Sequence, residues 1–429
     1  MDILFKNITV VTMDSENPVI ENADVGISGR KITHISATGE TEPTAARVIN
    51  GVGKVLMPGL YNCHSHAAMT LFRGFANDRS LEDWLFNYLI PAEAKLTPEL
   101  VRTGTLLAMA EMLSSGTVAF TDMYYFMDTV AEAVHDVGML ANISNGVTKD
   151  GFDFYRGTFY QTTRVLGDTH KDGRVKLNAH IHGCYTSPPS WWEQVAAFAQ
   201  AHHLRMHVHL SETKTEHENC IKTYGKTPAA MFAEHGVFNV PTTAAHGVWV
   251  TDEDIAILAE KDVTVAHNPI SNLKLASGLA PVQKMKTAGV NVALGTDGVS
   301  SNNSHDLFEE LKMASLLQKY ATNDPTALPA FETLAMATAN GAKAQGRSHE
   351  SGMIKMGYDA DILLMDFDNP RQTVCYDPIL NLAYSTSGRD VEMTICRGKV
   401  LYEKGEFMTI DIEKTLHDAR QAKEIFLQA

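Results

Sequence analysis

The sequence predicts an α/β protein whose main part is a (β/α)8 barrel of the TIM type, with a small split β-sandwich domain contributed by both chain ends. Three observations support this fold class. Eight short apolar runs alternate with helix-like stretches between about Val55 and Tyr320, which is the order of eight consecutive βα units. Strand-like segments flank that region on both sides. Polar residues suited to a metal site follow several of the runs, where a barrel carries its catalytic side chains.

The flanking segments read as strands, turns and one helix. Short strands are expected at Ile3–Met13 and Asp24–Ser36, with turns at Gly29-Arg30 and Gly51–Gly53, and Ala360–Phe367 and Val391–Met408 return to strand and hairpin character. The last stretch has a helical pattern over Ile412–Leu427. We therefore expect the β-sandwich at residues 1–56 and 351–410, the barrel at 57–350 and a closing helix at 411–429.

The barrel strands are the eight apolar runs in chain order. They are Val55–Asn62, Thr117–Tyr124, Leu140–Val147, Val175–Gly183, Met206–Leu210, Thr243–His246, Val263–His267 and Val292–Thr296.

Composition limits the classes of function. The chain has 429 residues, 44% of them hydrophobic, which is enough for a large core. Its formal net charge of −15, with no cluster of Lys or Arg, argues against a nucleic-acid partner. Five scattered cysteines without a CxxC pair disfavour a disulfide framework and suit a reducing cytoplasm. The sequence contains neither a signal-peptide pattern nor a long apolar span, so we expect no membrane association.

A metal-hydrolase site is the strongest functional signal. His64 and His66 share one side of an extended segment, because strand side chains alternate with period two. His209 and Asp297 complete a ligand set that zinc or ferrous iron accepts. Glu212, three residues after His209, is placed to act as acid or base beside such a metal. Other histidines are expected to be ordinary core or surface residues, namely His180, His202, His203, His207 and His217, and Asp122 is expected to have a structural role.

The motifs resemble those of the amidohydrolase superfamily, in particular its aminopurine deaminases that act on methylthioadenosine and S-adenosylhomocysteine. The similarity rests on several motifs in the same order: residues 57–66 with 69–74, Trp84-Leu85, Pro91-Ala92-Glu93, His209-Leu-Ser-Glu212, Ala245-His246, 267–275 and Gly295-Thr-Asp297-Gly298. The resemblance implies one divalent metal held by His64, His66, His209 and Asp297, with zinc expected first and iron or manganese as alternatives. It implies that Glu212, His246 and Asp297 handle the water and the protons of a hydrolytic deamination.

Substrate residues follow from the same resemblance. Glu93 occupies the position of a glutamate that accepts hydrogen bonds from ribose hydroxyls, Trp84 that of a wall on the 5′ side, and His182 that of a nucleoside contact. Members acting on S-adenosylhomocysteine tend to carry an arginine where this chain has Asn145. Asn lacks the charge and the fork that a carboxylate prefers, so we expect uncharged 5′ groups: methylthioadenosine, adenosine or 5′-deoxyadenosine.

Two other interpretations stay open from the sequence. A hydrolase of another aminated or chlorinated heterocycle, of the s-triazine, guanine or pterin type, would use the same chemistry. A non-catalytic paralogue would usually have lost metal ligands, and this sequence lacks none of them. Asn268 and the segment Ser301–Ser304 are either loop-capping groups or braces for the ligands. The resemblance also suggests a homo-oligomer, either a dimer or a tetramer.

Overall fold

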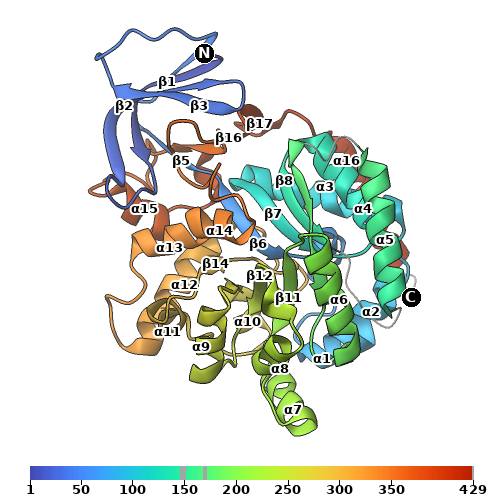
Figure 1. Cartoon of the computed structure of the whole chain (residues 1–429). Coiled ribbons are helices and arrows are strands. Elements are labelled where there is room, and N and C mark those ends of the chain that lie inside the picture. Colours follow the sequence, from blue (N-terminus) through green and yellow to red (C-terminus); the bar gives the residue numbers. More distant parts are fainter. Residues whose placement is uncertain (145–150, 168–171, 428–429) are drawn as a thin grey trace. The chain divides into compact units, whose positions relative to one another are not determined.

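The computed structural model describes residues 1–144, 151–167 and 172–427, and the chain divides into two compact units (Figure 1). The first unit comprises residues 1–62, 110–119 and 306–410. The second comprises residues 63–109, 120–305 and 411–429. This division into two units does not test the domain limits that the sequence suggests, and those limits stay a prediction.

The first unit contains a nine-stranded sheet. Its strands are β1 (Ile3–Val11), β2 (Val19–Ser28), β3 (Lys31–Ala37), β4 (Arg47–Asn50), β5 (Lys54–Pro58), β15 (Ile362–Asp366), β16 (Val391–Cys396), β17 (Lys399–Glu403) and β18 (Glu406–Phe407). Their order is β18-β17-β16-β15-β5-β1-β2-β3, with β4 paired to β1. The two ends of the chain join where β5 runs antiparallel to β15. Buried side chains from β1, β2, β5, β15 and β16 form one apolar core.

The remaining strands form two shorter sheets. One contains β6 (Leu60–Ser65), β7 (Thr117–Met123), β8 (Leu140–Ser144) and β9 (Val175–Leu177). The other contains β10 (Ala179–Ile181), β11 (Met206–Leu210), β12 (Thr242–His246), β13 (Thr264–His267) and β14 (Val292–Leu294), all parallel. These strands are buried almost throughout, which explains why they read as apolar runs and not as alternating ones.

Hydrogen bonds link these two sheets at both ends. Only Asn178 separates β9 from β10, and its N–H donates to the carbonyl of Ile143 at 2.9 Å. At the other end Ser65 forms a parallel bridge with Asp297, and the N–H of Asp297 donates to the carbonyl of His64 at 3.0 Å. The strand that carries the HxH pair therefore lies beside the strand that leads to Asp297.

The first expected barrel run is two strands. The chain leaves β5 at Pro58 and enters β6 at Leu60. Gly59 lies between them, where an added Cβ would come within 2.4 Å of Val118 Cγ1. A side chain at this position would collide, so glycine permits the close approach at which the chain passes between sheets.

Helices connect the strands. They are α1 (Leu81–Asp83), α2 (Ile90–Glu93), α3 (Pro98–Ser114), α4 (Met127–Val137), α5 (Gly151–Leu166), α6 (Pro189–Ala201), α7 (Lys214–Tyr224), α8 (Pro228–Glu234), α9 (Asp252–Glu260), α10 (Pro269–Lys274), α11 (Val282–Thr287), α12 (Leu307–Thr322), α13 (Ala330–Ala337), α14 (Ala339–Ala344), α15 (Pro378–Tyr384) and α16 (Ile412–Leu427). The side chain of Thr251 caps α9 in a capping box with Asp254. In the described ranges, no helix combines the length and the apolar character needed to cross a bilayer.

Candidate metal centre

The four expected ligands come together at the ends of three strands. His64 lies in β6 and His66 just after it, His209 lies in β11, and Asp297 follows β14. The Nε2 atoms of His64 and His66 lie 3.3 and 3.2 Å from Oδ1 of Asp297. Donor atoms of His64, His66 and His209 all lie within 4.8 Å of one another, as do those of His64, His246 and Asp297. The two groups share His64, and Asp297 also lies close to His66.

Hydrogen bonds to Nδ1 orient these rings. Nδ1 of His66 bonds the carbonyl of Met123, and Nδ1 of His209 bonds the carbonyl of His182, both at 2.6 Å. A carbonyl only accepts, so both rings donate from Nδ1, which leaves Nε2 as the atom available to a metal. Nδ1 of His64 lies 2.9 Å from Nε2 of His207. Backing of this kind fixes the tautomer that a metal requires.

Asp297 is held from the opposite side. Its Oδ2 accepts hydrogen bonds from Ser271 at 2.6 Å and from Ser301 at 2.9 Å, which leaves Oδ1 directed at the histidines. The backbone of Asp297 has a φ of +60°, a conformation that non-glycine residues adopt at a cost. The surrounding structure therefore holds Asp297 in a strained backbone conformation in which its Oδ1 points at His64 and His66.

The electrostatics of this cluster suit a cation. Burial opposes the charge of Asp297, yet hydrogen bonds to His64 and His66 hold its pKa well below the usual range. Burial also disfavours a charge on His66, but the bond to Asp297 outweighs it and raises the pKa of that ring to about 9. Burial lowers the pKa of His64 to about 3. The donor set thus combines a firmly ionised carboxylate, a neutral His64 and a His66 that keeps its proton, and a divalent metal would take the place of that proton.

Glu212 and His246 lie beside the cluster. Nε2 of His246 is 3.8 Å from Oε2 of Glu212, and Nδ1 of His246 bonds Oδ1 of Asn272 at 2.8 Å. Burial raises the pKa of Glu212 to about 7. The backbone N–H of Glu212 donates to Oε2 of Glu216 at 2.7 Å, which fixes the start of the loop that carries it. Glu212 can therefore take up and release a proton near neutral pH.

Glu93 lies at the end of α2 and is held by two tyrosines. Tyr124 donates to its Oε1 at 2.7 Å and Tyr125 to its Oε2 at 3.4 Å. Burial raises the pKa of Glu93 to about 7. The ring of Tyr124 lies 6.3 Å from that of His66, between centroids, so this carboxylate is linked to the metal cluster through one aromatic residue.

Of the remaining expected substrate residues, His182 and Trp84 lie in the described part of the chain. The ring of His182 lies 4.7 Å from that of His209, and burial lowers its pKa to about 4. Trp84 is buried, and within the described parts of the chain its Nε1 has no hydrogen-bond partner. Asn145 lies outside the described residues.

Several residues around the centre have contacts that the sequence reasoning did not assign. His207, expected to be an ordinary core residue, contacts His64; its position two residues before His209 on the same strand face is the signal that was available. Ser271 contacts Asp297, Asn272 contacts His246, and Glu216 contacts the backbone of Glu212. Ser301 bonds Asp297, an expected ligand, whereas Nδ2 of Asn268 lies 3.4 Å from Nδ1 of His246, which is not one of the expected ligands.

Asp122 has the contact expected of a structural residue. Its Oδ1 accepts the backbone N–H of Ala67 at 2.8 Å, which fixes the turn that follows His66.

Comparisons with known proteins agree with this geometry. The model of the amidohydrolase family matches residues 55–401. The chain is 45% identical to the 5′-deoxyadenosine deaminase of Methanosarcina mazei, covering 99% of this chain and 98% of that protein. It is 41% identical to the 5-methylthioadenosine/S-adenosylhomocysteine deaminase of Thermoanaerobacter pseudethanolicus, covering 100% of both.

Solved structures give the same result. An adenosine deaminase from Xanthomonas campestris with bound zinc superimposes with a TM-score of 0.95 at 32% identity, covering 100% of this chain and 99% of that chain. An atrazine chlorohydrolase from Arthrobacter aurescens, complexed with zinc, superimposes with a TM-score of 0.88 at 25% identity, covering 98% and 100%.

Proposed function

Given that the chain belongs to the amidohydrolase family, we propose that it is a metal-dependent hydrolytic deaminase of adenine nucleosides, which yields the inosine analogue and ammonia. The observation that carries the proposal is the cluster of His64, His66, His209 and Asp297 beside an acid–base pair. It occurs in a chain whose relatives at 41 to 45% identity bear the names of such deaminases.

The metal we propose is a single zinc ion held by His64, His66, His209 and Asp297, with iron or manganese as alternatives. The oriented Nε2 atoms and the ionised carboxylate support this assignment, as does the zinc bound to two proteins of similar structure. When bound, such a metal supplies the Lewis acidity that makes water a nucleophile near neutral pH.

The side chains of Glu212 and His246 transfer the protons of the reaction. Glu212, with a pKa raised to about 7 by burial, takes up the proton of the attacking water and donates it to the ring nitrogen beside the carbon attacked. His246, fixed by Asn272 and facing Glu212, assists the proton to the departing amine. Asp297 directs Oδ1 at the attacking water, because its Oδ2 is engaged by two hydroxyl groups.

Substrate recognition is assigned to Glu93, His182, Trp84 and Asn145. Glu93 accepts the ribose hydroxyls, since an ionised carboxylate retains lone pairs beyond those that Tyr124 and Tyr125 occupy. Trp84 forms the wall on the 5′ side and His182 contacts the nucleoside. Uncharged 5′ groups are preferred, so the best substrates are methylthioadenosine, adenosine or 5′-deoxyadenosine.

The finer architecture is also a proposal. The two shorter sheets form one closed (β/α)8 barrel, and the Ser65–Asp297 bridge and the short β9–β10 step support this. The nine-stranded sheet folds over its shared core as the split β-sandwich domain. We further propose a homo-oligomer, without a nucleic-acid partner. Five free thiols support a reducing cytoplasm as the site of action.

Ammonia release tests the proposal. The zinc-loaded protein is offered adenosine, methylthioadenosine, 5′-deoxyadenosine, S-adenosylhomocysteine, adenine, guanine and a chlorinated s-triazine. We expect release from the three uncharged nucleosides, and a fall in kcat of about 10²–10⁴-fold in Glu212→Gln with little change in binding. Glu218→Gln, an exposed glutamate paired with Lys214, is the matched control. If the zinc-bound protein released no ammonia from any purine, this would overturn the substrate class and favour the triazine or pterin alternative.

A further inference from the structure

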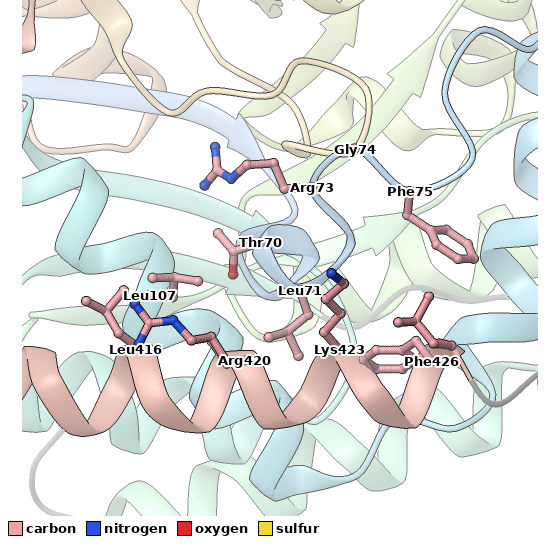
Figure 2. A pocket seen from close by; sticks show the side chains of 12 residues that line it. Thr70, Leu71, Arg73, Gly74, Phe75, Leu107, Leu416, Arg420, Lys423 and Phe426 are labelled. Atoms are coloured by element: carbon pink, nitrogen blue, oxygen red, sulfur yellow. The ribbon is translucent and has the colours of Figure 1, made fainter.

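We infer that the groove between residues 70–75 and helix α16 binds a small amphiphilic anion, a molecule with a phosphate, sulfonate or carboxylate group on an apolar body. The groove encloses about 430 Å³, within the range of small-molecule pockets. No residue that lines it belongs to the metal cluster. Figure 2 shows Lys423 pointing from α16 toward the segment that carries Leu71, and Arg420 extending along the helix toward Leu107.

The charge of the groove is the first argument. Three cations line it, Arg73, Arg420 and Lys423, and no acidic residue of the described chain does, although the whole chain has a net charge of −15. Arg73 donates to the carbonyl of Asn303. Arg420 and Lys423 have no ion-pair partner in the described part of the chain, whereas Lys414 of the same helix pairs with Asp418. Arg420 and Lys423 thus place two positive charges without an ion-pair partner in the described chain on one wall of the groove, where they attract an anion.

The apolar wall is the second argument. Leu71, Leu107 and Phe426 line the same groove as the cations. The Phe426 ring packs 4.6 Å from that of Phe72, between centroids, so this wall is anchored in the protein. A ligand that only offered an anion would leave this surface in contact with water. An apolar body gains the burial, and its charged group gains bonds from arginine that are stronger than neutral ones.

The test is calorimetric titration of the full-length protein with hexyl phosphate, compared with hexanol and with inorganic phosphate. We expect one site per chain for hexyl phosphate and binding at least about tenfold weaker for each of the other two, since each lacks half of the recognition. A variant with Arg420→Ala and Lys423→Ala together should lose about tenfold or more in affinity. Both side chains are exposed, so the fold should persist. Lys414→Ala removes a cation of α16 that does not line the groove and should bind as the parent does.

Five results would overturn the inference. They are absence of hexyl phosphate binding, equal binding of hexanol, equal binding of inorganic phosphate, an equal loss in Lys414→Ala, and displacement of hexyl phosphate by adenosine, which would assign the groove to the substrate site. Absence of binding, with a dimer that dissociates in the double variant, would assign the groove to a second copy of the chain. None of these results depends on deaminase activity, so the inference and the proposed function can fail separately.

Discussion

Asp297 illustrates how single residues set the properties of the centre. Its two oxygens have different neighbours, because the hydroxyls of Ser271 and Ser301 occupy Oδ2 while Oδ1 faces His64 and His66. A free carboxylate would rotate and could offer both oxygens to one cation. The two hydroxyls therefore favour binding of a metal through a single oxygen.

The first prediction concerns these hydroxyls. Ser271→Ala and Ser301→Ala should each weaken zinc binding by about tenfold to a hundredfold, the effect typical of groups that orient a ligand. Competition with a chromophoric chelator measures it. Ser300→Ala is the matched control, since its buried Oγ has no hydrogen-bond partner in the described residues. Unchanged zinc affinity in both variants would show that the hydroxyls do not orient Asp297.

Sequence reasoning reached the residues whose direction depends only on strand period. Alternation along an extended segment is enough to place His64 and His66 on one side of their strand, and it also fixes the side of its own strand on which His209 lies. Ser271 and Asn272 could not be assigned in this way, because they lie on α10 and their direction depends on where that helix begins. His207 obeys the same alternation as His209 and was within reach.

At the scale of elements, helix α3 positions the turn that follows His66. A Cβ added to Gly104 would lie 2.6 Å from the carbonyl oxygen of Ala68, so backbone meets backbone there. The hydroxyl of Thr70 also donates to the carbonyl of Gly104 at 2.6 Å. Glycine inside a helix costs stability, and here the cost permits the close contact.

The second prediction compares two helical glycines. Gly104→Ala should lower the free energy of unfolding by about 1–3 kcal/mol through overpacking. Gly157→Ala in α5 should raise it by about 0.5–1 kcal/mol, because nothing lies within 4 Å of the added Cβ. The thermal unfolding midpoint of the metal-loaded protein reports both changes. A stabilised Gly104→Ala variant would contradict the close contact.

Element boundaries were predicted where one pattern begins and ends with the element. Met206–Leu210 and Ile412–Leu427 have the limits that the apolar run and the helical pattern indicated. Val55–Asn62 did not, since an unbroken apolar run does not reveal that the chain changes sheet at Gly59. Hydrophobicity reports burial, and both sheets bury these residues.

At the scale of the whole molecule, the proposed metal ligands all belong to one unit. His64, His66, His209 and Asp297 lie in the second unit, and none lies in the unit that contains the nine-stranded sheet. A metal that binds only the folded form adds its binding free energy to the stability of the part that holds it. The two units should therefore respond differently when the metal is removed.

Hydrogen exchange measures that difference. Chelation should increase amide exchange in β11, β12 and β14 and leave β1, β2, β15 and β16 protected, because local stability need not be shared between compact units. With zinc at about a thousand times its dissociation constant, the second unit should lose about 4 kcal/mol on removal. Glu212→Gln keeps every proposed ligand and should give the same pattern, which separates metal binding from turnover. Equal loss of protection in both units would mean that they unfold as one, and the stabilising effect of the metal would then extend over the whole chain.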